Sequence, residues 1–189
     1  AVVVRSGIGK VNAGMCTQIL ADRFQADAVI NTGIAGSLKN EINIGDIVIS
    51  TAAVQHDMDA TVFGDPLGQV PQMDTFLFPA DECLVQKAKE VNEKVNPDIH
   101  TFTGIVASGD QFIASKEAKE KIVTNFHAFC AEMEGAAIAH AAYLNKVSCV
   151  IIRAISDKAD NSAVMDYPEF EKRAIRQNVR LVTELVAEI

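Results

Sequence analysis

The sequence predicts one α/β domain over residues 1–189, built on a largely parallel β-sheet. Apolar runs alternate with amphipathic stretches, which is the order expected when helices connect parallel strands. Two of the apolar runs end in glycine turns, at residues 7–9 and 33–36. A third run, over 147–155, is apolar almost throughout and is typical of a central strand covered on both faces. No repeat or interdomain linker divides the chain.

The first third of the chain predicts a strand, a helix and a second strand. Residues 1–6 read as a buried strand, and 27–32 as the next one, stopped by its glycine turn. Between them a helix is predicted over 10–24, because apolar side chains recur every four residues. Its two apolar rows are Val11, Met15 and Ile19, and Cys16, Leu20 and Phe24.

The middle of the chain contains a long irregular segment. Residues 43–56 predict one or two strands, interrupted near Gly45. From about 57 to 80 the pattern gives way to Gly, Pro and Asp, and a loop of this length is more often functional than not. A charged helix is predicted over 81–95 and a strand over 100–108.

The last third predicts alternating helices and strands. Ser115 is expected to cap a helix over 116–125. A strand over 128–133 leads into a helix over 135–144, which is apolar nearly all round and therefore expected to be buried. The strand at 147–155 precedes a final helix over 168–188. Apolar residues of that helix recur at helical spacing at Ile175, Val179, Val182, Val186 and Ile189.

Composition excludes several classes of protein. With 49% hydrophobic and 22% charged residues, the chain is not expected to be disordered. The net charge is −8 and the basic residues form no cluster, which argues against a nucleic-acid partner. The apolar runs are too short to cross a bilayer. The cysteines and histidines show no metal-ligand spacing, so we expect free thiols in a reducing cytoplasm and no metal site.

Ligands of α/β sheets gather at the carboxyl ends of strands, and several such ends carry chemistry here. Glu132 and Glu134 close an apolar strand; their spacing predicts that both carboxylates face one cleft, where a ribose diol would bind, unless the strand end is simply exposed. Asp157 also stands where a strand leaves the sheet. It is either an N-cap or turn residue, or a partly buried proton donor whose pKa is raised. Phe112 either stacks on a heterocycle or belongs to the core. The turn at residues 7–9 lacks a complete dinucleotide fingerprint.

Six segments extend this pattern over essentially the whole chain. They are Ser6-Gly7-Ile8-Gly9-Lys10-Val11, Asn31-Thr32-Gly33-Ile34-Ala35-Gly36, Gly45-Asp46-Ile47-Val48, Ser108-Gly109-Asp110-Gln111-Phe112-Ile113, Glu132-Met133-Glu134-Gly135-Ala136-Ala137-Ile138-Ala139 and Arg153-Ala154-Ile155-Ser156-Asp157. Each is weak alone, but six in order resemble the methylthioadenosine/S-adenosylhomocysteine nucleosidases of the purine nucleoside phosphorylase/hydrolase superfamily. The resemblance implies a three-layer α/β/α sandwich around a mixed, largely parallel twisted sheet, N-glycosidic bond hydrolysis, and no metal or organic cofactor.

The resemblance also implies roles for residues that bind the base. Asp157 matches the general acid that protonates N7 of adenine as the glycosidic bond breaks, and Ser156 lies beside it to orient the carboxyl. Phe112 matches the aromatic residue that stacks on the base. The backbone of Ile113 would read the adenine edge.

On the ribose side, Glu134 matches the residue that holds the hydroxyls, Met133 packs against the sugar, and Arg153 is expected among the substrate-binding residues. A phosphorylase holds phosphate with an Arg and a Ser around the second glycine turn. Asn31 and Ile34 stand at those positions here, which favours water as the nucleophile. Nucleosidases of this type often keep a Ser where Ile34 stands, so water positioning at this turn is expected to differ.

Two further expectations come from the resemblance. The segment at 57–80 matches a loop that reaches into the neighbouring subunit's site, where Phe63 and Pro71 would line an apolar pocket for the 5′ substituent, so a homodimer is expected. The family's water-activating Glu and its first strands precede the strand at residues 1–6. Because the chain opens directly in that strand, we expect an N-terminally incomplete domain.

Three alternatives remain open from the sequence. A purine nucleoside phosphorylase would release the base only with phosphate. A sister nucleosidase would act on a futalosine-type or AMP substrate, which a substrate panel would separate. A non-catalytic nucleoside-binding protein would bind the ligand without turnover.

Overall fold

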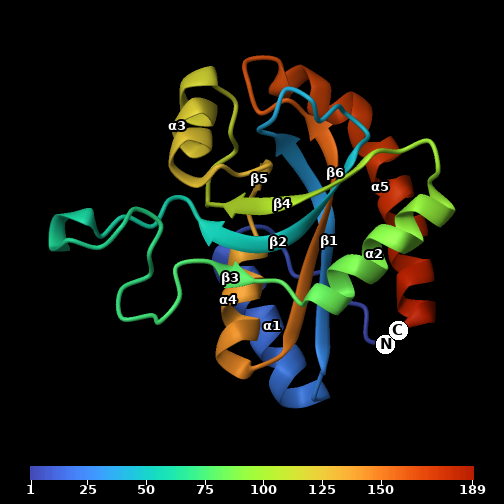
Figure 1. Ribbon diagram of the computed structural model, residues 1–189, viewed down its shortest axis with the longest axis horizontal. Helices are drawn as coiled ribbons and strands as arrows, with labels where there is room; N and C mark the ends of the chain where they lie inside the picture. The colour runs from blue at the N-terminus through green and yellow to red at the C-terminus, as the bar shows by residue number, and fades with distance from the viewer.

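A computed structural model describes the backbone of residues 1–189 and all side chains except those of 164–169 and 171–173. The strands are β1 (Ala28–Ser37), β2 (Ile47–Gln55), β3 (Phe78–Pro79), β4 (Thr101–Ser108), β5 (Cys130–Glu132) and β6 (Ser148–Asp157). The helices are α1 (Lys10–Phe24), α2 (Glu82–Val95), α3 (Lys116–Phe126), α4 (Gly135–Asn145) and α5 (Ala163–Glu188), with a 3-10 turn η1 (Thr61–Phe63) (Figure 1).

The strands form one mixed sheet in the order β3-β2-β4-β5-β1-β6. The two longest pairings, β1 with β6 and β2 with β4, are parallel, as is β4 with β5. An antiparallel pairing of β2 with β6 curls the sheet back on itself. The predicted α/β class with a mixed, largely parallel sheet is therefore confirmed.

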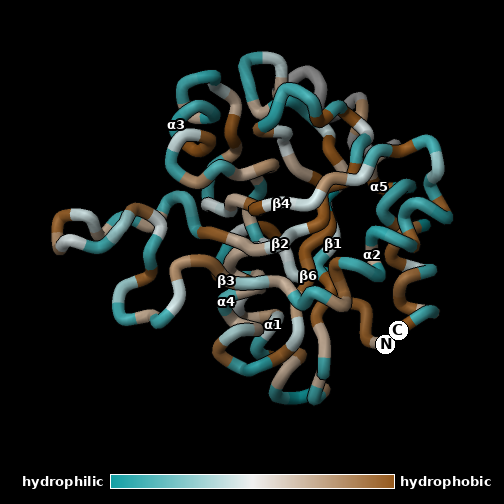
Figure 2. The backbone as a smooth tube through the Cα atoms, in the orientation of Figure 1, coloured by the Kyte–Doolittle hydropathy of each residue, from teal (hydrophilic) through white to brown (hydrophobic). Residues whose placement is uncertain are grey.

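Helices cover the sheet from two sides, and Figure 1 shows α1 and α4 on one face and α2 and α5 on the other. Hydrophobic residues concentrate along the strands between these layers (Figure 2). α4 is buried along its first half as predicted, while Leu144 in its last turn is 62% exposed. Its alanines let it pack closely against α1 and the sheet. Within the described part of the chain, none of the helices is long and apolar enough to span a membrane.

The prediction of a strand at residues 1–6 is wrong. This segment is irregular chain, and Val3 is 94% exposed. An apolar run becomes a strand only where a neighbour completes its hydrogen bonds, and residues 1–7 pair with no strand in the part of the chain that is described.

Three predicted boundaries also move. β1 does not stop at its glycine turn but continues to Ser37, because β6 pairs with it as far as Asp157. β2 begins only at Ile47, since Gly45 adopts φ 96° in the turn before it. The last helix begins at Ala163 rather than near residue 168.

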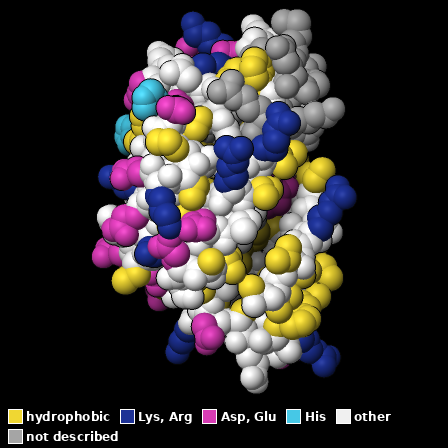
Figure 3. Space-filling model, turned by 90° about the vertical axis from the view of Figure 1, so that its right-hand side faces the viewer, with side chains coloured by type: hydrophobic (Ala, Val, Ile, Leu, Met, Phe, Trp, Pro, Cys, Tyr) yellow, Lys and Arg dark blue, Asp and Glu magenta, His cyan; other side chains and the backbone are white. Residues whose placement is uncertain are grey.

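Two helices expose part of the apolar rows picked out in the sequence, although Cys16 and Leu20 of α1 are half-buried as expected. In α1 the buried residues are Ala13 and Thr17, whereas Met15 is 62% exposed along with Val11 and Ile19. Among the described side chains of α5, the buried ones are Ala163, Ala174, Asn178, Leu181 and Leu185. Val182 is half-buried against the core, while Ile175, Val179, Val186 and Ile189 are exposed. Periodicity indicates that a helix has an apolar side, but contacts with the sheet decide which side is covered. Figure 3 shows hydrophobic side chains gathered along a hollow on one face.

Candidate active site

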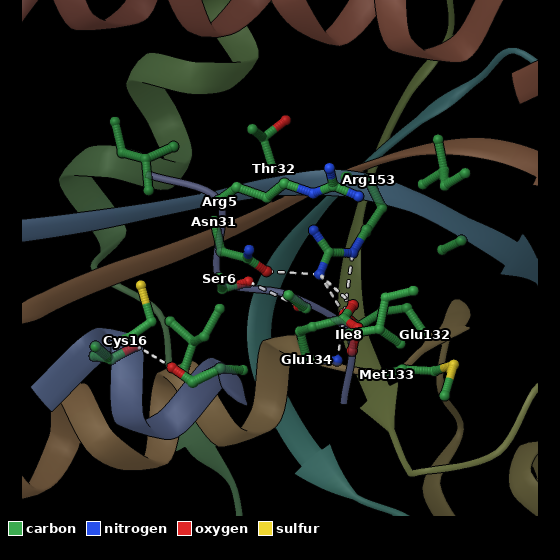
Figure 4. A pocket seen from close by; sticks show the side chains of 18 of the residues that line it. Arg5, Ser6, Ile8, Cys16, Asn31, Thr32, Glu132, Met133, Glu134 and Arg153 are labelled. Carbon is green, nitrogen blue, oxygen red and sulfur yellow. Dashed lines mark hydrogen bonds and ion pairs between the residues drawn. The ribbon is translucent and has the colours of Figure 1, made fainter. Parts of the chain in front are cut away.

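A cleft of about 600 Å³ opens beside the carboxyl ends of β1, β5 and β6, and residues 4–8 lie along it. Parallel strands such as β1 and β6 present their carboxyl ends at the same edge, which brings residues distant in the sequence together. The predicted site residues that line the cleft are Ile34, Phe112, Met133, Glu134, Arg153, Ser156 and Asp157. Figure 4 shows part of this arrangement.

The end of β6 fixes the carboxyl group of Asp157, which is 2% exposed. The hydroxyl of Ser156 donates to Asp157 Oδ2 at 2.8 Å, and the backbone amide of Ala159 donates to Oδ1 at 2.8 Å. Gly36 of β1 makes room for this carboxyl, since a Cβ there would lie 2.6 Å from Oδ1. Ser156 and Asp157 are thus neighbours in space as predicted, at the edge of the cleft.

Arg153 and Glu132 form a buried ion pair at the floor of the cleft. Arg153 Nε donates to Glu132 Oε2 at 3.2 Å, and Nη2 also donates to that oxygen. Glu132 accepts further hydrogen bonds from Ser108 Oγ and from the amides of Glu134 and Gly135. Burial alone would raise the pKa of Glu132, but Arg153 and these donors hold it below its usual value. The carboxylate is therefore charged and fully engaged.

Asn31 and Gly33 of β1 hold the other side of the guanidinium. Asn31 Oδ1 accepts from Arg153 Nη2 at 2.6 Å, as Figure 4 shows. A Cβ at Gly33 would come within 2.9 Å of Arg153 Nη1, so the missing side chain lets the guanidinium lie across the strand. Asn31, singled out in the sequence for its place in a phosphate-type turn, here orients Arg153.

Glu134 lies past the end of β5, where it precedes the first turn of α4. Glu134 therefore does not share a strand face with Glu132, but both residues line one cleft as expected, with Glu134 Oε2 3.9 Å from Arg153 Nη2. The amide of Gly9 donates to Glu134 Oε1 at 2.9 Å. Burial raises the pKa of Glu134, and the Gly9 amide opposes that shift.

The remaining predicted residues divide between the cleft and the core. The ring of Phe112 is 50% exposed at the cleft, and Met133 is half-buried there. The side chain of Ile113 is buried in the core under α3, and Ile113 does not line the cleft, so its expected contact with the base stays a prediction. Ile34 is half-buried and contacts both the cleft and the core beside α5.

Phe63 and Pro71 do not line this cleft. They belong to the segment between β2 and β3, which projects from the body of the molecule in Figure 1, and Phe63 is 86% exposed. The structure does not bring them to the site of their own chain. Their expected place in a neighbouring subunit's site stays a prediction.

Sequence reasoning missed a second polar cluster beside the cleft, formed by Lys10, Asp57 and Asp110. Lys10 follows a glycine turn, and Asp57 and Asp110 follow the ends of β2 and β4. These positions are the sequence signal that would have identified them. Among the side chains that the structure describes, no group of His, Cys, Asp or Glu is arranged to hold a metal ion.

The chain is similar to known proteins in both sequence and structure. The family model of the phosphorylase superfamily matches residues 1–187. A 5′-methylthioadenosine/S-adenosylhomocysteine nucleosidase of Staphylococcus carnosus (strain TM300) is 43% identical over 186 residues, which cover 98% of this chain and 80% of that protein. The corresponding enzyme of Neisseria meningitidis, in complex with methylthio-immucillin-A, is 40% identical with a TM-score of 0.93, covering 97% of this chain and 79% of that one. Futalosine hydrolase of Helicobacter pylori strain 26695 is 36% identical with a TM-score of 0.92, covering 97% and 78%.

Proposed function

This chain belongs to the phosphorylase superfamily and, within it, to the methylthioadenosine/S-adenosylhomocysteine nucleosidases, and from that membership we propose that it hydrolyses the N-glycosidic bond of both nucleosides. The products are adenine and the 5-thioribose compound. The observation that carries the proposal is one cleft holding a fixed acid, Asp157, and a separate carboxylate, Glu134.

Asp157 acts as the general acid. An adenine anion is a poor leaving group, so N7 takes a proton as the bond to the ribosyl cation breaks. The hydroxyl of Ser156 and the amide of Ala159 hold the carboxyl at the cleft edge, so the proton is delivered from a fixed position. Phe112 stacks on the base, and the backbone of Ile113 reads its edge.

Glu134 accepts hydrogen bonds from the ribose hydroxyls, and Met133 packs against the sugar. Arg153 neutralises the floor of the cleft and keeps Glu132 charged, so two neighbouring carboxylates coexist there. Water is the nucleophile, because Asn31 binds Arg153 and Ile34 offers no hydrogen bond to phosphate. Its oxygen bonds to the anomeric carbon that adenine leaves, and the proton that it loses passes to solvent.

We propose further that residues 1–189 belong to one nucleosidase domain, within a cytoplasmic homodimer that takes small nucleosides and no nucleic acid. The net charge of −8 disfavours a polyphosphate partner. The four cysteines are free among the described residues, and burial raises the pKa of Cys149 to about 12, as suits an inert thiol in a reducing compartment.

The test is adenine release from 5′-methylthioadenosine in phosphate-free buffer, followed by chromatography of the products. We expect adenine and free 5-methylthioribose. Release that requires phosphate and gives a ribose 1-phosphate would replace the proposal with a phosphorylase. Calorimetric binding of the nucleoside without turnover would indicate a binding protein. A panel that includes futalosine and AMP would identify a sister nucleosidase, which the likeness to futalosine hydrolase makes the relevant comparison.

A further inference from the structure

Three loops at the edge of the cleft are joined by a closed ring of hydrogen bonds. Lys10 Nζ donates to Asp57 Oδ1 at 2.6 Å, and the backbone amide of Asp110 donates to Asp57 Oδ2 at 2.9 Å. The ring closes because the amide of Lys10 donates to Asp110 Oδ1 at 2.8 Å. Lys10 Nζ also reaches Gln55 Oε1 at 3.2 Å. Lys10 begins α1, Asp57 follows β2 and Asp110 follows β4.

The ring touches both halves of the proposed substrate site. Gly9, directly before Lys10, donates its amide to Glu134 Oε1. Phe112 lies two residues after Asp110, in a segment with no regular secondary structure of its own. Gly7 and Gly9 adopt φ of 87° and 91°, a conformation that other residues rarely adopt, so the turn depends on glycine at both positions.

We propose that Lys10, Asp57 and Asp110 are positioning residues that hold the Gly9 amide against Glu134 and the start of the Phe112 segment beside the cleft. The inference rests on the proposed function for its catalytic consequence, but the contacts that carry it do not depend on a substrate. No residue of the ring is assigned a contact with the nucleoside.

The charged side chains of the ring are largely buried. The side chains of Lys10 and Asp57 are each 17% exposed, so solvent screens their attraction only partly. Burial raises the pKa of Asp57, but the hydrogen bonds from Lys10 and from the Asp110 amide outweigh it and leave the pKa below its usual value. Asp57 is therefore charged at neutral pH, and the ring persists throughout the working range of an enzyme.

Breaking the ring has a predictable effect on Glu134. The charged groups that face Glu134 are Glu132 from β5 and Arg153 from β6, and the amides of Gly9 and Met133 also hydrogen-bond to it. Lys10 turns its ammonium group toward Asp57 instead. Losing the Gly9 amide removes a donor that favours the carboxylate, so the pKa of Glu134 rises when the ring is broken.

The experiment follows the Gly9 amide by ¹H–¹⁵N NMR in the full chain as the pH is lowered. Glu134→Gln identifies the part of the titration that belongs to Glu134. In Lys10→Met and Asp57→Asn we expect the midpoint to rise by about one unit, while Lys10→Arg stays near the wild type. Lys94→Met, which removes a lysine from an exposed ion pair between α2 and α5, is the matched control and leaves the midpoint unchanged.

Kinetics with 5′-methylthioadenosine are measured on the same variants. We expect kcat/KM to fall about 10- to 100-fold in Lys10→Met and Asp57→Asn, with the acid limb of its pH profile displaced upward and thermal unfolding little changed. If the pH midpoint of the Gly9 amide is unchanged in both variants, the positioning role of the ring is wrong, whatever activity the variants show. If the wild type releases no adenine, the proposed function is wrong. The NMR titration still tests whether the ring positions the Gly9 amide.

Discussion

At the scale of single residues, three carboxyl groups within one cleft have three different environments. Glu132 is buried against Arg153 and fully hydrogen-bonded. Glu134 is half-buried and accepts a hydrogen bond from the Gly9 amide. Asp157 is held by a hydroxyl and an amide at the end of β6. Separate environments allow neighbouring carboxyl groups to take separate roles, which in the proposed function are those of a structural anion, a ribose acceptor and a proton donor.

Replacing the proposed acid tests its role most directly. Asp157→Asn keeps the shape of the side chain but removes the proton that adenine N7 requires, so kcat is expected to fall about 10²- to 10⁴-fold with a smaller change in KM. Steady-state adenine release measures both constants, and circular dichroism checks the fold. Near wild-type kcat in this variant would remove Asp157 from the leaving-group step.

The buried ion pair makes a prediction about stability. Glu132→Gln leaves the Arg153 guanidinium without its counter-charge, which is expected to lower the free energy of unfolding by about 3 kcal/mol at pH 7. Urea unfolding of the variant measures this loss. The double variant Glu132→Gln/Arg153→Met should recover part of it, because no unpaired charge remains. A double variant no more stable than Glu132→Gln would mean that the loss comes from packing.

The same pair predicts a pH dependence. The pKa of Glu132 is lower in the fold than its ordinary value of 4.5, so the unfolded chain binds its proton first as the pH falls. The stability that Glu132 contributes is therefore complete above about pH 4.5 and is lost as the pH falls toward the folded pKa. The difference between the wild type and Glu132→Gln should shrink only below that pH; a constant difference down to acid unfolding would contradict the assignment.

At the scale of elements, the parallel pair of β1 and β6 builds the site. β1 continues past the point where the glycine pattern suggested a stop, β6 runs to Asp157 rather than ending at residue 155, and their register shifts between Ala35 and Gly36. This extension carries Asp157 to the cleft edge opposite the residues of β1. Gly33 and Gly36 leave the room that Arg153 and Asp157 occupy, so these glycines serve close approach rather than a tight turn.

A methyl group at Gly36 is expected to displace the acid. Its Cβ would lie 2.6 Å from Asp157 Oδ1 and 2.8 Å from the Cβ of Ala159, so Gly36→Ala should lower kcat at least about tenfold and reduce stability by about 1–3 kcal/mol. Adenine release and urea unfolding measure the two effects. The control is Gly14→Ala in α1, where nothing lies within 4 Å of the new Cβ. Full activity in Gly36→Ala would show that catalysis tolerates a displaced Asp157 carboxyl group.

At the scale of the whole molecule, two apolar features are exposed in the single chain. Phe63 and Val62 lie at the tip of the projecting segment, and the front of α1 exposes Val11 and Met15, with Ile8 just before it. Exposed apolar surface of this kind marks interaction sites. In a two-fold dimer the same two surfaces occur on each subunit, so the segment of one copy can cover the cleft entrance of the other.

Complementation tests that arrangement. Phe63→Asp and Asp157→Asn are each expected to be nearly inactive alone. In a mixed dimer, the subunit with an intact Asp157 receives the intact Phe63 of its partner, so co-expression should restore about a quarter of wild-type activity if subunits mix at random. Co-expressed Asp157→Asn and Glu134→Gln are the control and should stay inactive, because no subunit keeps a whole site. No restoration in the first mixture would place Phe63 outside the partner's site.

The sequence by itself determined the α/β class, most helix positions, the Ser115 cap and the strand ends that carry the site, because these follow from periodicity and local chemistry. The cap is confirmed, since Ser115 Oγ accepts from the Ala118 amide at 3.2 Å. Only the tertiary structure decided which side of α1 is buried, where β1 ends, and that Lys10 meets Asp57. Those outcomes depend on which segments pack together across long separations, and a pattern along one chain does not contain the partner that completes a strand, covers a helix or neutralises a charge.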